Sequence, residues 1–147
     1  MFFGMRKFLF LVLTVALLST AISACSTNNS STSLHMMPLD QMPAEVQSAP
    51  LVVQQAYQFA AANPDVMKQI PCYCSCGNIG HTSNYSCYVS RADEKGDVAF
   101  DSHALGCSIC VDITQDVMRL LREGKSPQEA RAYIDATYSK YGPSNIP

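Results

Sequence analysis

Six cysteines in the middle of the chain are the residues best suited to carry chemistry. Three alternate in Cys72-Tyr73-Cys74-Ser75-Cys76, one stands alone, and two form a Cys-x-x-Cys pair. Thiolates bind Cu(I), Zn(II) and iron–sulfur clusters because sulfur is polarisable, and the Cys-x-x-Cys spacing recurs in metal sites. The spacing therefore predicts a soft-metal site for Cu(I) or Zn(II), with the ligands Cys72, Cys74, Cys76, Cys87, Cys107 and Cys110.

The same thiols have two alternative uses. A thiol–disulfide oxidoreductase would need chiefly Cys107 and Cys110 as attacking and resolving sulfurs, and the start of a helix would favour a thiolate there. A disulfide-stapled structural lipoprotein is the third hypothesis, because six cysteines can all be paired. Bridges within the Cys72–Cys76 triplet would close very small, strained loops, which counts against this third hypothesis.

Two histidines are additional ligand candidates. His81 follows the triplet, and His103 precedes Cys107 by four residues. An imidazole can ligate copper or zinc, or support a ligand by a hydrogen bond. The sequence contains no recognisable serine–histidine–acid pattern, phosphate-binding glycine loop or paired-carboxylate motif, so we expect binding without a catalysed step.

The first residues predict export and lipidation. Arg6 and Lys7 precede an apolar run, and Ile22-Ser23-Ala24-Cys25 follows it. This order is typical of a secretory signal, and the last four residues resemble the lipobox of bacterial lipoproteins. The apolar run is shorter than the roughly 20 residues that span a bilayer. We therefore predict a signal peptide at residues 1–24, lipidation of Cys25, and a lipid-anchored location at the extracytoplasmic side of the cell membrane.

Helical segments are expected to position the cysteines. Apolar spacing and capping residues predict helices over residues 50–61, 64–70, 108–123 and 127–141. Ile113 and Val117 belong to the apolar stripe of the third. Ser126-Pro127-Gln128-Glu129 has the form of a capping box that opens the fourth, in which Tyr133 is expected to face inward.

The stretch between the two helix pairs is poorly helical, and Tyr85–Ser90 with Val98–Phe100 predicts a short β-hairpin there. The predicted fold is a small, mainly α helical bundle with a cysteine-rich loop. We expect a lipidated flexible tether at residues 25–47, a cysteine-rich helical domain at 48–143 and a tail at 144–147.

The net charge of the protein limits the classes of molecule that it is expected to bind. The chain has 12 acidic and 10 basic residues, and cleavage would remove Arg6 and Lys7 but no carboxylate. An acidic mature protein is not suited to nucleic-acid binding, which depends on neutralising phosphates. The expected partners are the membrane, through the lipid anchor, and a metal-transfer or redox protein.

The cysteine string resembles a known family. Pro71-Cys72-Tyr73-Cys74-Ser75-Cys76 resembles the motif of the bacterial PCYCGC lipoproteins, with Ser75 in place of the glycine. The similarity continues through Gly80-His81, Cys87, Phe100-Asp101-Ser102-His103 and Cys107–Ile113. It implies an extracytoplasmic cysteine-rich lipoprotein.

A fainter resemblance joins the Cys-x-x-Cys pair to Gly124-Lys125-Ser126 and Lys140-Tyr141-Gly142. This order is similar to the thiol-oxidoreductase subunit of cytochrome c maturation systems. That subunit is a small helical bundle, so the resemblance implies a helical fold and the oxidoreductase alternative.

Overall fold

The computed structural model describes residues 33–93 and 96–146. The predicted signal peptide at residues 1–24 and the predicted lipidation site Cys25 lie outside these residues. Within the described ranges, no helix combines the length and the apolar character needed to cross a membrane.

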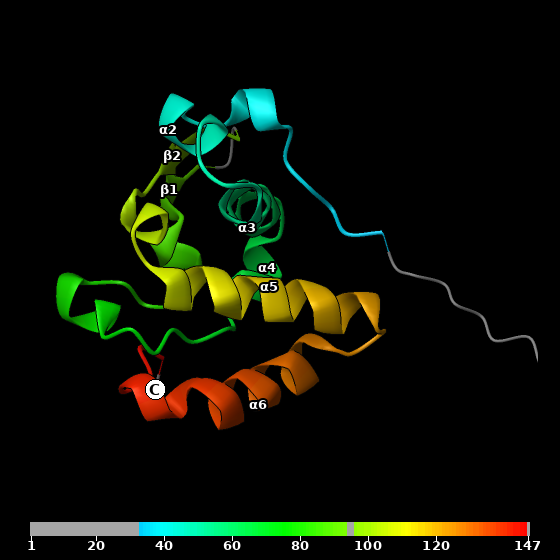
Figure 1. Cartoon of the computed structure of the whole chain (residues 1–147), viewed down its shortest axis with the longest axis vertical. Helices are drawn as coiled ribbons and strands as arrows, with labels where there is room; N and C mark the ends of the chain where they lie inside the picture. The colour runs from blue at the N-terminus through cyan, green and yellow to red at the C-terminus, as the bar shows by residue number, and fades with distance from the viewer. Residues whose placement is uncertain (1–32, 94–95, 147) are drawn as a thin grey trace, which may run out of the picture. The chain divides into compact units, whose positions relative to one another are not determined.

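Four helices build the frame and confirm the mainly α fold. They are α3 (Leu51–Ala62), α4 (Pro64–Met67), α5 (Ser108–Arg122) and α6 (Pro127–Tyr138). Figure 1 shows α5 with α3 on one side and α6 on the other, and α5 packs against both. The helix that carries two of the cysteines is therefore the central element of the fold.

Local sequence explains how α5 and α6 form. Ile113 and Val117 are fully buried, as their spacing predicts. Ser126 accepts a hydrogen bond from the Glu129 backbone N–H, and the Glu129 carboxylate accepts one from Ser126, which confirms the capping box. Tyr133 is 39% exposed, which corrects its expected inward position, because its ring lies beneath the Arg119 guanidinium on the surface.

The hairpin is present but begins later than predicted. Strand β1 (Val89–Ala92) pairs with antiparallel β2 (Val98–Phe100), whereas Tyr85–Cys87 forms a 3₁₀ turn. The segment before β1 does not extend the hairpin; it contacts the chain after α4, where the Asn84 backbone N–H donates to the Ile70 carbonyl. The helical stretch predicted for residues 64–70 ends early, at Met67, where the Gln69 and Ile70 backbone N–H groups donate to carbonyls three residues back.

The residues before α3 pack on the domain, in contrast to the flexible tether predicted up to residue 47. Helix α2 (Ala44–Gln47) precedes α3, and Met42 and Val46 are buried in the core. The Met37 backbone N–H also donates to the Gln58 carbonyl. The boundary expected near Ser48 was too late because these isolated apolar residues lie in a proline-rich stretch without helical periodicity.

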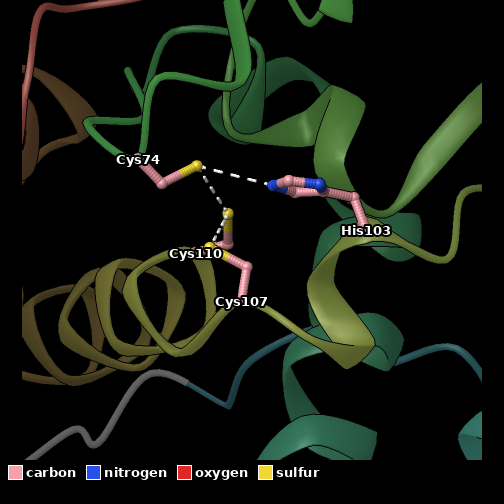
Figure 2. A group of neighbouring side chains, drawn as sticks. All are labelled: Cys74, His103, Cys107 and Cys110. Carbon is pink, nitrogen blue, oxygen red and sulfur yellow. Dashed lines mark hydrogen bonds between the residues drawn. The ribbon is translucent and has the colours of Figure 1, made fainter.

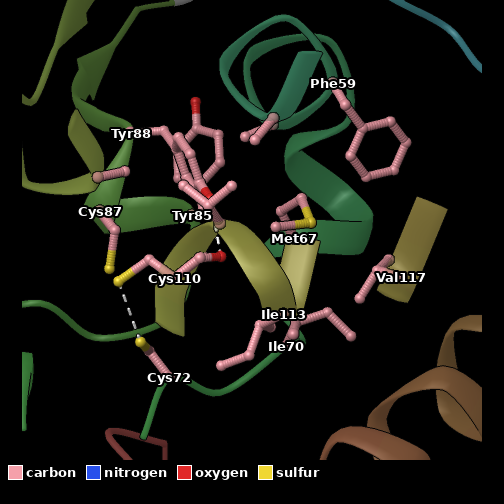
Figure 3. Packing of buried hydrophobic residues seen from close by; sticks show 14 of the residues in the cluster. Phe59, Met67, Ile70, Cys72, Tyr85, Cys87, Tyr88, Cys110, Ile113 and Val117 are labelled. Carbon is pink, nitrogen blue, oxygen red and sulfur yellow. Dashed lines mark hydrogen bonds between the residues drawn. The ribbon is translucent and has the colours of Figure 1, made fainter. Parts of the chain in front are cut away.

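Several cysteines lie at the edge of the hydrophobic core. Figure 3 shows Cys72, Cys87 and Cys110 converging beside the buried side chains of Tyr88 and Ile113. The core consequently fixes one side of the thiol cluster, since close-packed interiors restrict side-chain movement.

Candidate metal centre

The fold brings all six predicted cysteine ligands together. The loop before Gly77 supplies three, the turn before β1 supplies Cys87, and the start of α5 supplies Cys107 and Cys110. Neighbouring Sγ atoms in this thiol cluster (Cys72, Cys74, Cys76, Cys87, Cys107 and Cys110) are separated by 3.1–3.6 Å. All six are free thiols.

The more open part of the cluster contains Cys74, His103, Cys107 and Cys110, whose ligand atoms all lie within 4.8 Å of one another. Figure 2 shows Cys107 and Cys110 rising from the start of α5 toward Cys74. The Cys110 Sγ lies 3.1 Å from that of Cys107 and 3.5 Å from that of Cys74, which in turn lies 3.5 Å from the His103 Nε2. Sulfurs around a tetrahedral zinc lie about 3.8 Å apart, given Zn–S bonds of about 2.3 Å. A small opening of the group is enough to admit an ion.

The deeper part of the cluster involves the buried thiols. Cys72, Cys87 and Cys110 form one close group, and the triplet Cys72, Cys74 and Cys76 forms another. The Cys72 Sγ lies 3.3 Å from that of Cys110, and the Cys76 Sγ lies 3.6 Å from that of Cys87. The groups share members, so the described cysteines make one continuous cluster.

Both predicted histidines belong to the site. His81, His103, Cys76 and Cys87 form a fourth group with ligand atoms within 4.8 Å. The two imidazole rings meet edge to face, with centroids 5.0 Å apart. The Cys and His residues present can therefore hold a metal ion.

Burial and mutual hydrogen bonds shift the pKa values of the clustered thiols in opposite directions. The hydrogen bond with Cys110 lowers the pKa of Cys72, and hydrogen bonds with Cys110 and Cys72 lower that of Cys76. Burial raises the pKa of Cys74, and hydrogen bonds with Cys72 and Cys76 raise that of Cys110. Thiols that lose a proton more readily therefore lie beside thiols that lose it less readily, and a metal that binds them displaces the protons that they hold.

Polar residues that the sequence analysis missed hold the start of α5. The Tyr88 hydroxyl donates to the Cys110 carbonyl at 2.8 Å, and the Asn84 amide contacts the same carbonyl at 3.3 Å. Asn84 also donates to the Thr114 hydroxyl at 2.9 Å. These residues are distant in sequence from their partners, so no local motif could have revealed their role.

The predicted tail at residues 144–147 includes a further residue that the sequence analysis missed, Asn145. Its Oδ1 accepts from the Cys72 backbone N–H at 2.7 Å, and its Nδ2 donates to the His81 carbonyl at 3.2 Å. The same Nδ2 lies 3.5 Å from the Cys76 Sγ. The described end of the chain is therefore part of the wall of the site, because it ties the cysteine triplet to the His81 loop.

Ser75 occupies a position that favours glycine. Its φ of 66° lies in the left-handed region, and its side chain is exposed. That conformation costs an L-residue about 1–2 kcal/mol, which glycine avoids. This strain gives a physical reason for the glycine of the PCYCGC motif.

We predict that Ser75→Gly raises the free energy of unfolding by about 1 kcal/mol, because relief of strain exceeds the added flexibility of the unfolded chain. Chemical denaturation of the reduced, metal-free protein measures the change. Ser75→Ala keeps the Cβ and serves as the control, with no comparable gain. Equal effects of the two substitutions would contradict this explanation.

Comparison with known proteins gives one family. The family model described as a protein of unknown function with PCYCGC motif matches residues 14–147. No curated protein and no solved structure gave a significant match. The fainter likeness to the thiol-oxidoreductase subunit of cytochrome c maturation is therefore not supported by these comparisons. The match covers most of the chain, including every cysteine of the cluster, and the chain belongs to the PCYCGC family.

Proposed function

We propose that the protein is an extracytoplasmic lipoprotein that binds Cu(I) through clustered thiolates and sequesters or delivers it. The observation that carries this proposal is the convergence of six free thiols at neighbouring separations of 3.1–3.6 Å. Disulfide staples would join the sulfurs in separate pairs, whereas the Cys110 Sγ is a close neighbour of three other sulfurs. A set of soft, polarisable donors held on one side by a packed core is suited to a soft ion.

The composition of the cluster favours Cu(I) over Zn(II) as the principal cargo. Thiolates bind both ions, but Cu(I) is the softer of the two, so a donor set in which sulfurs outnumber imidazoles suits it best. Cys74 and Cys107 are only partly buried, whereas Cys72 and Cys110 are buried. Because the thiols near Cys107 are less buried, the ion can enter and leave on that side, by exchange with the ligands of a metal-transfer protein.

The thiol–disulfide oxidoreductase is the second candidate. Cys107 is the N-cap residue of α5, and its Sγ lies 3.1 Å from that of Cys110. This placement suits an exchanging pair. However, the Cys110 Sγ is also 3.3 Å from that of Cys72 and 3.5 Å from that of Cys74, contacts that exchange between two sulfurs does not require.

Single substitutions distinguish these functions. We expect Cys74→Ser and Cys107→Ser each to weaken Cu(I) binding sharply, because each removes a thiolate from one shared site. The measurement is competition with a Cu(I) chelator, using reduced protein under anaerobic conditions. If the protein is an oxidoreductase, Cys74→Ser will retain disulfide reductase activity and Cys107→Ser will lose it. Failure of the wild-type protein to compete with a weak chelator would show that the metal proposal is wrong.

The proposed lipidation of Cys25 can be tested separately from metal binding. Cys25→Ser removes the thiol that must be acylated before cleavage, so we expect no lipid labelling and accumulation of the uncleaved precursor. Metabolic labelling with a fatty acid and cell fractionation provide the measurement, with Ser26→Ala as the control. Two or more acyl chains are needed for stable anchoring, so the unlipidated mature domain should be released if it forms. Normal maturation of Cys25→Ser would rule out the lipoprotein proposal.

A further inference from the structure

The eight candidate donors form overlapping groups, which can be divided into two sets of four with different chemistry and no shared member. The first contains four thiols, with the Cys110 Sγ 3.1–3.5 Å from those of Cys72, Cys74 and Cys107. The second contains two thiols and two imidazoles, from Cys76, Cys87, His81 and His103, with all ligand atoms within 4.8 Å. A four-coordinate ion needs four donors, so no donor has to be shared if each set holds one ion.

His81 has an unsatisfied nitrogen in the second set. Its side chain is only 10% exposed, and its Nδ1 is buried without a hydrogen-bond partner in the described part of the chain. A buried polar atom without a partner is costly, so this nitrogen is available to a water molecule or to an ion. The other ring nitrogen, Nε2, lies 3.5 Å from the Asp101 carboxylate.

This arrangement has the form of a carboxylate–histidine–metal relay. A histidine that ligates a metal usually donates its other N–H to a carboxylate, which fixes the tautomer and the ring orientation. Here Asp101 can accept from Nε2 and leave the Nδ1 lone pair for an ion. Asp101 also accepts from the His103 backbone N–H through Oδ1 at 2.8 Å, so one carboxylate contacts the His81 ring and the backbone of His103.

We propose that Cys76, Cys87, His81 and His103 form a second metal position for Zn(II), and that Asp101 is its positioning residue. Two thiolates with two imidazoles are a standard tetrahedral zinc set, whereas the four thiols of the first set suit Cu(I). The proposal rests on the proposed metal-binding function and extends it to two ions of different character. The zinc position lies beside the copper position, and the Cys76 and Cys87 thiols join it to the core.

Zinc stoichiometry tests the second position. We titrate the reduced full chain anaerobically with Zn(II) and count bound ions by native mass spectrometry. The wild-type protein should hold two ions, since four thiolates also accept zinc. His81→Gln and Cys110→Ser should each hold one, and the double variant should hold none. A wild-type stoichiometry of one, or two ions in His81→Gln, overturns the second position. Failure of the wild-type protein to bind any metal instead overturns the proposed function itself.

Asp101→Asn tests the positioning role. The substitution keeps the backbone groups of Asp101, which accept from the Tyr57 hydroxyl and donate to the Tyr88 carbonyl, so the fold should persist. It should weaken binding at the second position about 10–100-fold, as is typical for loss of an outer ligand partner. Co(II) bound in place of zinc should show altered visible absorption, which a merely structural role would not change.

Asp97→Asn, an exposed carboxylate in the hairpin, is the matched control and should behave as wild type. The melting temperature of the metal-free Asp101→Asn protein should equal that of the control. Unchanged zinc affinity and an unchanged Co(II) spectrum in Asp101→Asn would overturn its assignment as the positioning residue.

Discussion

Cys110→Ser is expected to weaken Cu(I) binding more than any other single cysteine substitution. The Cys110 Sγ lies within 3.5 Å of the sulfurs of Cys72, Cys74 and Cys107, so it is the common neighbour of the thiol-only set. Serine is similar in size but lacks the soft, polarisable sulfur. The loss should exceed the roughly 10–100-fold that removal of an outer partner costs, because a direct ligand is removed.

The measurement is competition with a Cu(I) chelator, made on reduced protein in the absence of oxygen. Ser75→Gly is the control, because it changes a residue between two cysteines of the triplet and keeps all six thiols. It should bind Cu(I) like the wild-type protein. A Cys110→Ser protein that folds normally by circular dichroism and retains wild-type affinity would show that the thiols do not act as one centre.

Val117→Asp should be severely destabilising. Val117 is fully buried on the face of α5 that packs into the core. An unpaired charge in such a place is costly, and we expect the free energy of unfolding to fall by about 4 kcal/mol or more. For a domain of this size, the melting temperature would then drop by more than about 15 °C.

Thermal unfolding of the reduced, metal-free protein, followed by circular dichroism, provides the measurement. Val52→Asp introduces the same side chain on the surface near the start of α3, where the valine is 52% exposed. It should change the stability by no more than about 0.5 kcal/mol. Equal melting temperatures for the two variants would show that the α5 stripe is not part of the core.

Local sequence was sufficient to predict the main helices and their faces. The period of Ile113 and Val117 predicted the buried stripe of α5, and Ser126 with Glu129 predicted the cap of α6. Each signal depends on residues within one or two turns, where backbone geometry links spacing to position. The strand and helix ends were less predictable, since long-range contacts such as the hydrogen bond from Asn84 to Ile70 leave no signal in the local sequence.

The candidate ligands were also evident from residue type and spacing. All six cysteines of the cluster, with His81 and His103, were predicted from the sequence, and the structure brings them together. The relay through Asp101 was not predicted, because a lone aspartate carries no signal until its distance to an imidazole is known. Asn145 was missed for the same reason and was assigned to a tail.

The element types, the supply of soft donors and the family motif depend on near neighbours in the chain and could therefore be predicted. Which donors share a site depends on how distant segments of the chain pack together. Chain folding brings Cys72 and Cys110, 38 positions apart, to an Sγ separation of 3.3 Å, and it buries the Nδ1 of His81. These residues come together because the loop that carries the cysteine triplet packs against α5. The spacing of cysteines along the chain does not reveal which of them will share a metal ion.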